Sequence, residues 1–463
     1  MRILPVVNNY FSALSTYKNN QYDYSQYRVP VLGDSVSFSA KCPKIDTHEK
    51  FRKLMIWAKV HCLYCKKPMT FDDDMINLWK KQKVFTAPIG KFVKTIKPHK
   101  ESLMPTEGVV FSIIENISKK NPDVSLSSVI KIMSLQANKK LLEIQEPILR
   151  EITLASSVLP EQIQHNINKL IEKNRCRLLN IPYIDEFSPK EFAYKIKNIL
   201  KTMPNDRNVF KLKRLYQTLT LPQLKHPNQE IDGKTIERIE HHIGFNNDNR
   251  NFKLGRKVKK SRKKLLEIIV QNIKETALQT KNKDLIKLCE ENEKRLNGLP
   301  TTSKFSNKAF IYDLNEALEN CENKPVRAQL FQLANLLPTS DNSIHAFIAK
   351  HDQASNSTIA YNLLNPSSVT IEHMKPSSEG GPDALKNWAG AHKRCNNIRQ
   401  SKDMEDYYCK IFSEENAQSY WDDIMHLANK GYFTFNEVKE MIKIFKSQSH
   451  IKVKSKALKF RNE

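Results

Sequence analysis

The stretch from Val109 to Asp232 contains no glycine, and this absence constrains the fold of the chain more than any other feature. The stretch is dense in Leu, Ile, Lys, Glu and Gln, which helices tolerate or favour. Apolar residues such as Ile130, Met133 and Leu141 recur at a spacing typical of one helix face. We therefore expect an all-helical domain here, and the lack of a fixed-length repeat argues against a solenoid.

Helix boundaries can be predicted within this stretch. Ser188 is a suitable N-cap, Pro189 fits the first helical position, and Glu191 stands where a capping box places its acid. We expect the prolines to interrupt the helices, because a proline inside a helix removes a backbone hydrogen bond. The expected breaks are Pro147, Pro160, Pro182, Pro204 and Pro222.

Size and charge limit the class of protein. A chain of 463 residues exceeds the roughly 250–300 residues at which one core stops growing, so we expect at least two domains. Lys and Arg number 75 against 50 Asp and Glu, and the resulting charge of +25 attracts polyanions. Nucleic acid is the leading expected partner, and a merely basic soluble protein is the alternative. We expect a cytoplasmic protein without a membrane partner, since no run of 18 apolar residues occurs and the N-terminus is too short of apolar residues for a signal peptide.

The segment 249–264, NRNFKLGRKVKKSRKK, carries nine Lys and Arg and no acid. Such a run is often only a solvated face, but it is also suited to phosphate contacts. The candidate nucleic-acid-binding residues are Lys253, Arg256, Lys257, Lys259, Lys260, Arg262, Lys263 and Lys264.

A second informative stretch is TIEHMKPSSEGGPDALKNWAGAHKRCNNIRQSKD, residues 370–403. The β-branched residues before it predict a short strand that ends at Glu372 and His373. Gly380, Gly381 and Pro382 predict a loop, NWAGAH predicts a second strand, and the residues from 395 onward predict a helix. A further strand is expected at VSFSA, residues 36–40.

The polar residues of this stretch suit phosphodiester hydrolysis. His373 is a natural general base, because the unperturbed pKa of histidine lies near neutrality. Glu372 and Asn396 offer hard oxygen ligands for Mg²⁺ or Mn²⁺. The alternative is that His373 caps a helix or a turn while the asparagines satisfy loop backbone.

Taken together, Glu372-His373, Pro376, Gly380-Gly381, Asn387, Cys395-Asn396 and Arg399 resemble the motif of the HNH endonucleases, which have a ββα-metal fold. The spacing from His373 to Asn387 and from Asn387 to Asn396 also resembles that family. The resemblance implies that His373 is the general base and that Glu372 and Asn396 bind one divalent cation. At the position of Glu372 the family more often has Asp or His, and Asn397 is an alternative to Asn396.

The same resemblance assigns two further residues. Asn387 would tie the loop between the strands and orient His373. Arg399 would contact the phosphate. The cleaved DNA would carry 5′-phosphate and 3′-hydroxyl ends.

Many HNH nucleases also have a structural zinc ion held by two cysteine-containing turns. CLYCKKPMTF, with Cys62 and Cys65, resembles the upstream turn, and His392-Lys-Arg-Cys395 resembles the downstream one. We expect these four residues to bind one tetrahedral Zn²⁺. Alternatives are that Cys62 and Cys65 bind metal with Cys42 or His61, or remain reduced core thiols.

The expected fold is mainly α, with many helices and a small ββα-metal nuclease domain that includes a zinc knuckle. The expected domains are an N-terminal segment 1–75, an α-helical domain 76–345 inserted within the nuclease domain, an HNH core 346–410, and C-terminal helices with a basic tail 411–463. The expected function is DNA cleavage, by analogy in restriction or anti-phage defence with protein partners. The alternative is a DNA-binding scaffold with an inactive HNH unit, and RNA is a less favoured substrate.

Several residues are not expected to have a functional role. Trp57 and Trp79 are expected in the core. The pair His241-His242 is expected on a helix surface, and Asp72 to Asp74 are expected at a turn or helix start.

Overall fold

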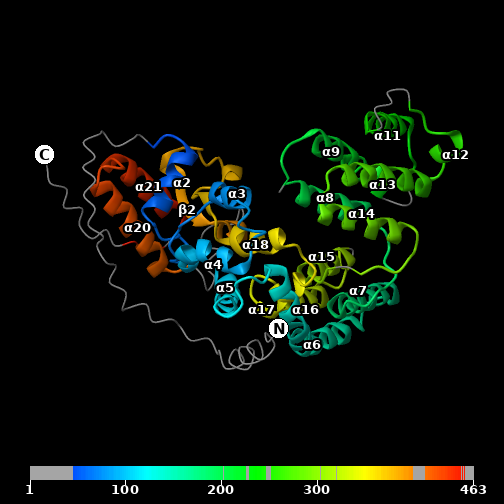
Figure 1. Cartoon of the computed structure of the whole chain (residues 1–463), viewed down its shortest axis with the longest axis horizontal. Helices are drawn as coiled ribbons and strands as arrows, with labels where there is room; N and C mark the ends of the chain where they lie inside the picture. Colours follow the sequence, from blue (N-terminus) through cyan, green and yellow to red (C-terminus); the bar gives the residue numbers. More distant parts are fainter. Residues whose placement is uncertain are drawn as a thin grey trace. The chain divides into compact units, whose positions relative to one another are not determined.

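The computed structural model describes residues 45–201, 203–225, 229–246, 252–302, 304–319, 321–399, 412–449, 451 and 453. The chain divides into two compact units, shown in Figure 1. The first unit comprises Met1–Met133 and Asn356–Glu463, and the second comprises Ser134–Ser355. The expected strand at 36–40 and the basic C-terminal tail lie outside the described residues, as does Cys42.

The second unit therefore interrupts the first in sequence. It begins at Ser134, whereas the helical domain was expected from residue 76, and the expected limits 1–75, 76–345, 346–410 and 411–463 remain a prediction.

The first unit contains helices from both ends of the chain. Their bounds are α2 (His48–Trp57), α3 (Asp73–Lys81), α4 (Ile89–Ile96), η1 (Lys97–Ser102), α5 (Pro105–Ser118), the start of α6 (Leu126–Ser156), α18 (Asn356–Leu364), η2 (Asn365–Ser367), η3 (Ser377–Glu379), η4 (Leu385–Asn387), α19 (Lys393–Arg399), α20 (Glu414–Asn429) and α21 (Phe435–Gln448).

The strands β1 (Val369–His373) and β2 (Trp388–His392) form a two-stranded antiparallel sheet. His373 pairs with Trp388, and Val369 pairs with His392. The order strand, loop, strand and helix that the sequence predicted is confirmed, although the part of the expected helix after Arg399 lies outside the described residues.

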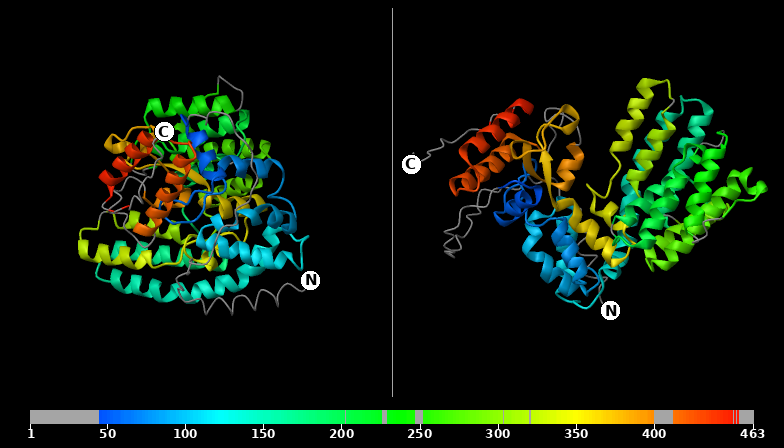
Figure 2. Two further views of the ribbon diagram at one scale, coloured as in Figure 1. Left: turned by 90° about the vertical axis from the view of Figure 1, so that its left-hand side faces the viewer. Right: turned by 90° about the horizontal axis from the view of Figure 1, so that it is seen from above.

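The sheet is held in a core built from segments distant in sequence. Figure 2 shows α20 and α21, in orange and red, beside the strands. The buried apolar residues shared between α2, β2, α20 and α21 include Phe51, Met55, Ala389, Ala391, Tyr420, Trp421 and Met441. A Cβ atom at Gly390 would lie 2.6 Å from the methyl carbon of Met69, so the glycine lets the side chains of Met69 and Met55 pack directly against β2.

The second unit consists of packed helices within the described residues. It contains the rest of α6, α7 (Glu161–Leu179), α8 (Pro189–Leu200), α9 (Arg207–Leu219), α10 (Pro222–Lys225), α11 (Gly233–Asn246), α12 (Arg256–Lys259), α13 (Arg262–Gln279), α14 (Lys283–Leu296), α15 (Asn307–Ala317), α16 (Lys324–Asn335) and α17 (Ile344–Lys350). Apolar residues of α8, α9, α11, α13 and α14 share one core cluster, and residues of α6, α7, α15 and α16 share another. The mainly helical fold with a small ββα part is therefore confirmed.

The start of α8 has the predicted N-cap, but the carboxylate of Glu191 pairs with Lys195 rather than closing a capping box, and one predicted break is wrong. The Ser188 side chain accepts a hydrogen bond from the backbone N–H of Glu191, which confirms it as the N-cap of α8. Pro147 lies inside α6, which continues through it to Ser156. Burial of Leu149 and Ile152 beyond the proline stabilises that part of the helix against the lost hydrogen bond.

The tryptophans also differ from one another. Trp79 is buried as expected, but Trp57 is 63% exposed and lies against Tyr432. Trp57 was expected in the core because it shares a helical period with Phe51 and Leu54, yet it ends α2 and falls beside that buried face. Asp72 is the N-cap of α3, as expected for a helix start. Among the described residues, no helix has both the length and the apolar character needed to span a membrane.

Candidate functional site

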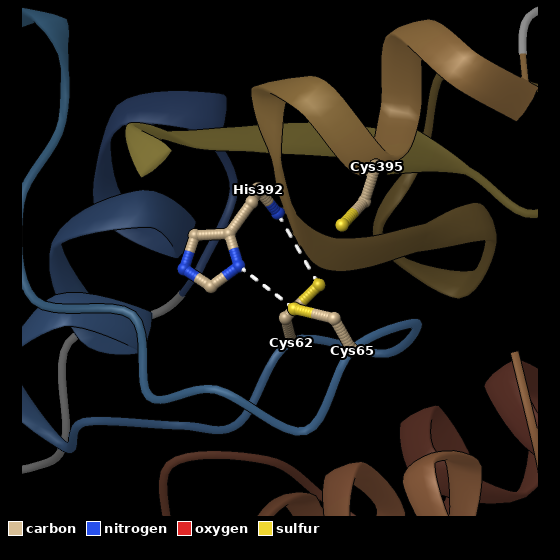
Figure 3. A group of neighbouring side chains, drawn as sticks. All are labelled: Cys62, Cys65, His392 and Cys395. Carbon is tan, nitrogen blue, oxygen red and sulfur yellow. Dashed lines mark hydrogen bonds between the residues drawn. The ribbon is translucent and has the colours of Figure 1, made fainter. Parts of the chain in front are cut away.

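Cys62, Cys65, His392 and Cys395 form one cluster, although the two pairs are far apart in sequence. Figure 3 shows the two thiols of the upstream loop facing the β2–α19 junction. Their ligand atoms all lie within 4.8 Å of one another, with Cys65 Sγ 3.2 Å from His392 Nδ1. A tetrahedral zinc ion with bonds near 2.3 Å places its sulfur ligands about 3.8 Å apart, so the donor set fits this ion.

Hydrogen bonds around the cluster fix its geometry. The backbone N–H of His392 donates to Cys62 Sγ over 3.3 Å. Ser102 Oγ lies 3.4 Å from His392 Nε2, which leaves Nδ1 as the nitrogen that faces the thiols. Metal-ligating histidines commonly bond an outer partner in this way.

The electrostatics of the cluster favour a cation among thiolates. Burial lowers the pKa of His392, but Cys65 and Cys62 raise it more strongly, to about 10. Burial raises the pKa of Cys62, yet hydrogen bonds from Cys395 and Cys65 bring it well below its ordinary value. A bound cation would stabilise the same negative charge.

The loop between β1 and β2 is closed by Asn387, which is fully buried. Its Oδ1 accepts from the backbone N–H of Lys375 over 2.8 Å, and its Nδ2 donates to the carbonyls of Lys375 and Pro382. Gly380 has φ +75°, and a side chain at Gly381 would lie 2.0 Å from the carbonyl oxygen of Lys375. Two glycines are therefore required where this loop turns.

His373 lies at the end of β1, and its direct partner is Asp383 of the same loop. His373 Nε2 is 3.1 Å from Asp383 Oδ1. His48, at the start of α2, places its Nε2 2.7 Å from the same oxygen, and Trp388 Nε1 donates to it over 2.9 Å. Asn387 makes no such contact with His373, so its expected orienting role remains a prediction.

These three neighbours strongly favour the ionised form of Asp383. The hydrogen bond from His373, followed by those from His48 and Trp388, lowers the pKa of Asp383 to about 2. The carboxylate is therefore charged across the physiological range, although its side chain is 64% exposed. A carboxylate in this position holds Nε2–H of a neutral imidazole and leaves Nδ1 to accept a proton.

Glu372 precedes His373 in β1, so its side chain lies on the opposite face of the strand. It is buried, with 2% of its surface exposed. Its Oε1 forms an ion pair with Arg399, whose side chain also donates to the carbonyls of His373 and Met374 over 2.8 Å each. Burial raises the pKa of Glu372 to about 7, although the charge of Arg399 lowers it. This carboxylate therefore has a protein partner where the sequence predicted a metal ligand.

The helix residues expected in the site have protein contacts as well. Asn396 Nδ2 donates to the carbonyl of Ile371 over 2.9 Å, which joins α19 to β1. Asn397 is exposed. The Arg399 side chain is 1% exposed, so its expected contact with a phosphate remains a prediction.

Some cations of the basic segment in the second unit have protein partners, and others are exposed. Lys259 pairs with Glu240 over 3.1 Å, Lys264 pairs with Glu267 over 2.9 Å, and Arg262 donates to the carbonyl of Gln223. The other candidates are exposed, namely Lys253, Arg256, Lys257, Lys260 and Lys263.

Two residues of the site were not predicted from the sequence. Asp383 follows Gly380, Gly381 and Pro382, and the sequence indicated only that it belongs to a loop. His48 is separated from His373 by the whole second unit in sequence, and no motif indicates it. The sequence signal that would have indicated Asp383 is its position at the end of the tight glycine-containing loop that follows His373.

Comparison with protein-family models identifies residues 358–402 as similar to the family HNH endonuclease. This range includes β1, β2 and α19. Neither the comparison with curated proteins nor that with solved structures gives a match.

Proposed function

On the premise that residues 358–402 are an HNH endonuclease domain, we propose that this chain is a divalent-metal-dependent nuclease that hydrolyses phosphodiester bonds in DNA. The observation that carries the proposal is the contact of His373 Nε2 with Asp383. It leaves Nδ1 of the imidazole to take a proton from water. The net charge of +25 supports a polyanionic substrate, and double-stranded DNA is the form we propose.

In this mechanism His373 Nδ1 accepts a proton from the water that attacks the phosphorus. Glu372 and Asn396 would hold Mg²⁺ or Mn²⁺, which supplies positive charge at the leaving oxygen. Their chemistry fits, because both offer hard oxygens. Arg399 occupies Oε1 of Glu372, so Oε2 is the oxygen left for the ion, and the amide of Asn396 donates through Nδ2, which leaves Oδ1.

The remaining residues have supporting roles. Asn387 closes the loop that carries Asp383, and Arg399 stabilises the end of β1. We propose that Cys62, Cys65, His392 and Cys395 bind a structural Zn²⁺, so that the nuclease domain is assembled from two parts of the chain around an inserted helical domain.

Replacement of the base tests this proposal. His373→Ala should lower the cleavage rate of a supercoiled plasmid in Mg²⁺ by roughly 10²–10⁴-fold, the usual contribution of general base catalysis. Affinity for the same DNA, measured by gel shift, should change little. His426→Ala, an exposed histidine of α20, is the matched control. Undiminished cleavage by His373→Ala would contradict the assignment.

The setting of the activity is also a proposal. By analogy with other HNH proteins, we propose a cytoplasmic restriction or anti-phage defence effector that acts with protein partners of that system. Products with 5′-phosphate and 3′-hydroxyl ends are expected, and end-labelled fragments would identify them.

A DNA-binding scaffold with an inactive HNH unit is the alternative function. The ion pair between Glu372 and Arg399 favours it, because the ion pair engages a carboxylate that the metal would need. A titration of Mg²⁺ and Mn²⁺ with supercoiled plasmid and protein that carries one equivalent of Zn²⁺ separates the two functions. Binding without nicking at every metal concentration would support the scaffold.

A further inference from the structure

His48, His373 and Asp383 form a second group of metal-ligating side chains in the first unit. They come from the start of α2, the end of β1 and the loop between the strands. Their ligand atoms lie within 4.8 Å of one another, and Asp383 Oδ1 is 2.7 Å and 3.1 Å from the two Nε2 atoms. Ligands bound to one ion at about 2.0–2.2 Å stand about 3 Å apart, so the separations suit a shared cation.

The donor set indicates the class of cation. Imidazole nitrogens suit Zn²⁺, Ni²⁺ and Co²⁺, whereas Mg²⁺ takes oxygen ligands. Three protein ligands leave coordination positions for water, as in open transition-metal sites. The side chains of His48 and Asp383 are 41% and 64% exposed, which gives an ion access from solvent.

We propose that His48, His373 and Asp383 form a regulatory site for such transition-metal ions, and that an ion bound there switches the nuclease off. The regulatory part rests on the proposed function, because it needs His373 as the base. Trp388 Nε1 donates to Asp383 Oδ1 and holds this carboxylate toward the histidines. The indole therefore acts as an outer partner of the site.

The proposed inhibition depends on the chemistry of a neutral imidazole, which has one N–H and one nitrogen with a free lone pair. Without the ion, Nε2–H of His373 donates to Asp383, and the lone pair of Nδ1 can accept a proton from water. An ion on Nε2 requires the lone pair of that nitrogen, so the proton must reside on Nδ1. The ring then has no free lone pair, and it cannot act as a base.

Calorimetry tests the site without reference to cleavage. Ni²⁺ is titrated into the full chain, which is free of any histidine tag and is loaded with one equivalent of Zn²⁺ for the cysteine cluster. The wild type should bind one Ni²⁺ more than His48→Gln or Asp383→Asn. His426→Gln, which replaces an exposed histidine outside the cluster, should bind as the wild type does. Equal Ni²⁺ stoichiometry in wild type and His48→Gln would overturn the site.

Cleavage in Mg²⁺ with and without Ni²⁺ tests the switch. Wild-type cleavage should be lost at the Ni²⁺ concentrations that fill the site in calorimetry. His48→Gln should retain a much larger fraction of its own Ni²⁺-free rate at the same concentrations. Full cleavage by the wild type with the site filled would overturn the switch. Absence of cleavage in Mg²⁺ alone would instead contradict the proposed nuclease, and calorimetry would still decide whether the ion binds.

Discussion

At the scale of single residues, the guanidinium of Arg399 holds the end of β1 by three contacts. It pairs with Glu372 and donates to the carbonyls of His373 and Met374. A buried charge left without its partner is costly, because water cannot solvate it. The position of the proposed base therefore depends on Arg399, whose guanidinium donates to the backbone carbonyl of His373.

Removal of this guanidinium should destabilise the first unit. Arg399→Met removes the cation that pairs with buried Glu372, which must then stay charged without it or take up a proton, and the expected loss is about 3–5 kcal/mol in the free energy of unfolding. Urea unfolding followed by tryptophan fluorescence measures it. Lys386→Met, an exposed cation of the same domain, should cost little. Equal stability of the two variants would show that the ion pair contributes nothing net.

At the scale of a single helix, neighbouring charges set the pKa of Glu191 in α8. Burial raises the pKa of Glu191, but Lys195 and Arg177 lower it, and the net result is a pKa of about 2. The unfolded value is near 4.3, so the folded state binds its proton less readily. Glu191 therefore stabilises the fold fully above the unfolded pKa, and this contribution is lost as the pH falls from about 4.3 toward 2.

An acid titration of stability checks this sign. Between about pH 5 and pH 3 the wild-type second unit should lose more stability than Glu191→Gln, which has no carboxyl group to protonate at this position. Denaturant midpoints at several pH values give the comparison. Glu161→Gln, an exposed acid of α7, should follow the wild type. A wild-type slope no steeper than that of Glu191→Gln would contradict the prediction.

The basic segment around α12 tests DNA binding at the same scale. If exposed Lys257 and Lys260 contact phosphates, replacing each by Gln should reduce the slope of log affinity against log salt by about 0.9. Lys259→Gln should change the slope less, since Lys259 already pairs with Glu240. Lys294→Gln, an exposed lysine outside the segment, is the control. An unchanged slope in Lys257→Gln and Lys260→Gln would show that the segment is only a solvated face.

At the scale of the whole molecule, the cluster of Cys62, Cys65, His392 and Cys395 connects distant parts of the chain. Cys62 and Cys65 precede the second unit in sequence, and His392 and Cys395 follow it. A structural zinc ion contributes its binding free energy to folding. Its loss should therefore weaken the first unit and leave the internally packed second unit in place.

Calorimetric unfolding with and without a zinc chelator measures this difference. Chelation should lower the temperature of one transition and leave the other unchanged. Cys62→Ser should reproduce the effect without chelator. Cys176→Ser, in α7 of the second unit, should not. A single transition that moves as a whole would contradict independent stability of the two units.

Local sequence signals were sufficient for much of this protein. The glycine-free stretch predicted helices, the Ser188 cap is confirmed, and the glycine pair marked the loop between two strands. These features depend on backbone preferences within a few residues, so they can be read without the fold. The predicted helix break at Pro147 was wrong, because the packing of Leu149 and Ile152 outweighs the one backbone hydrogen bond that proline removes.

The sequence by itself therefore determined the helical class and the ββα element, since short-range periodicity and spacing encode them, while the residues of the candidate site remain a prediction. Only the tertiary structure brought His48 to Asp383 and buried Glu372 against Arg399. It also joined the two halves of the thiol cluster. Such contacts depend on how distant segments pack around a shared core, and no local pattern records which segments will meet.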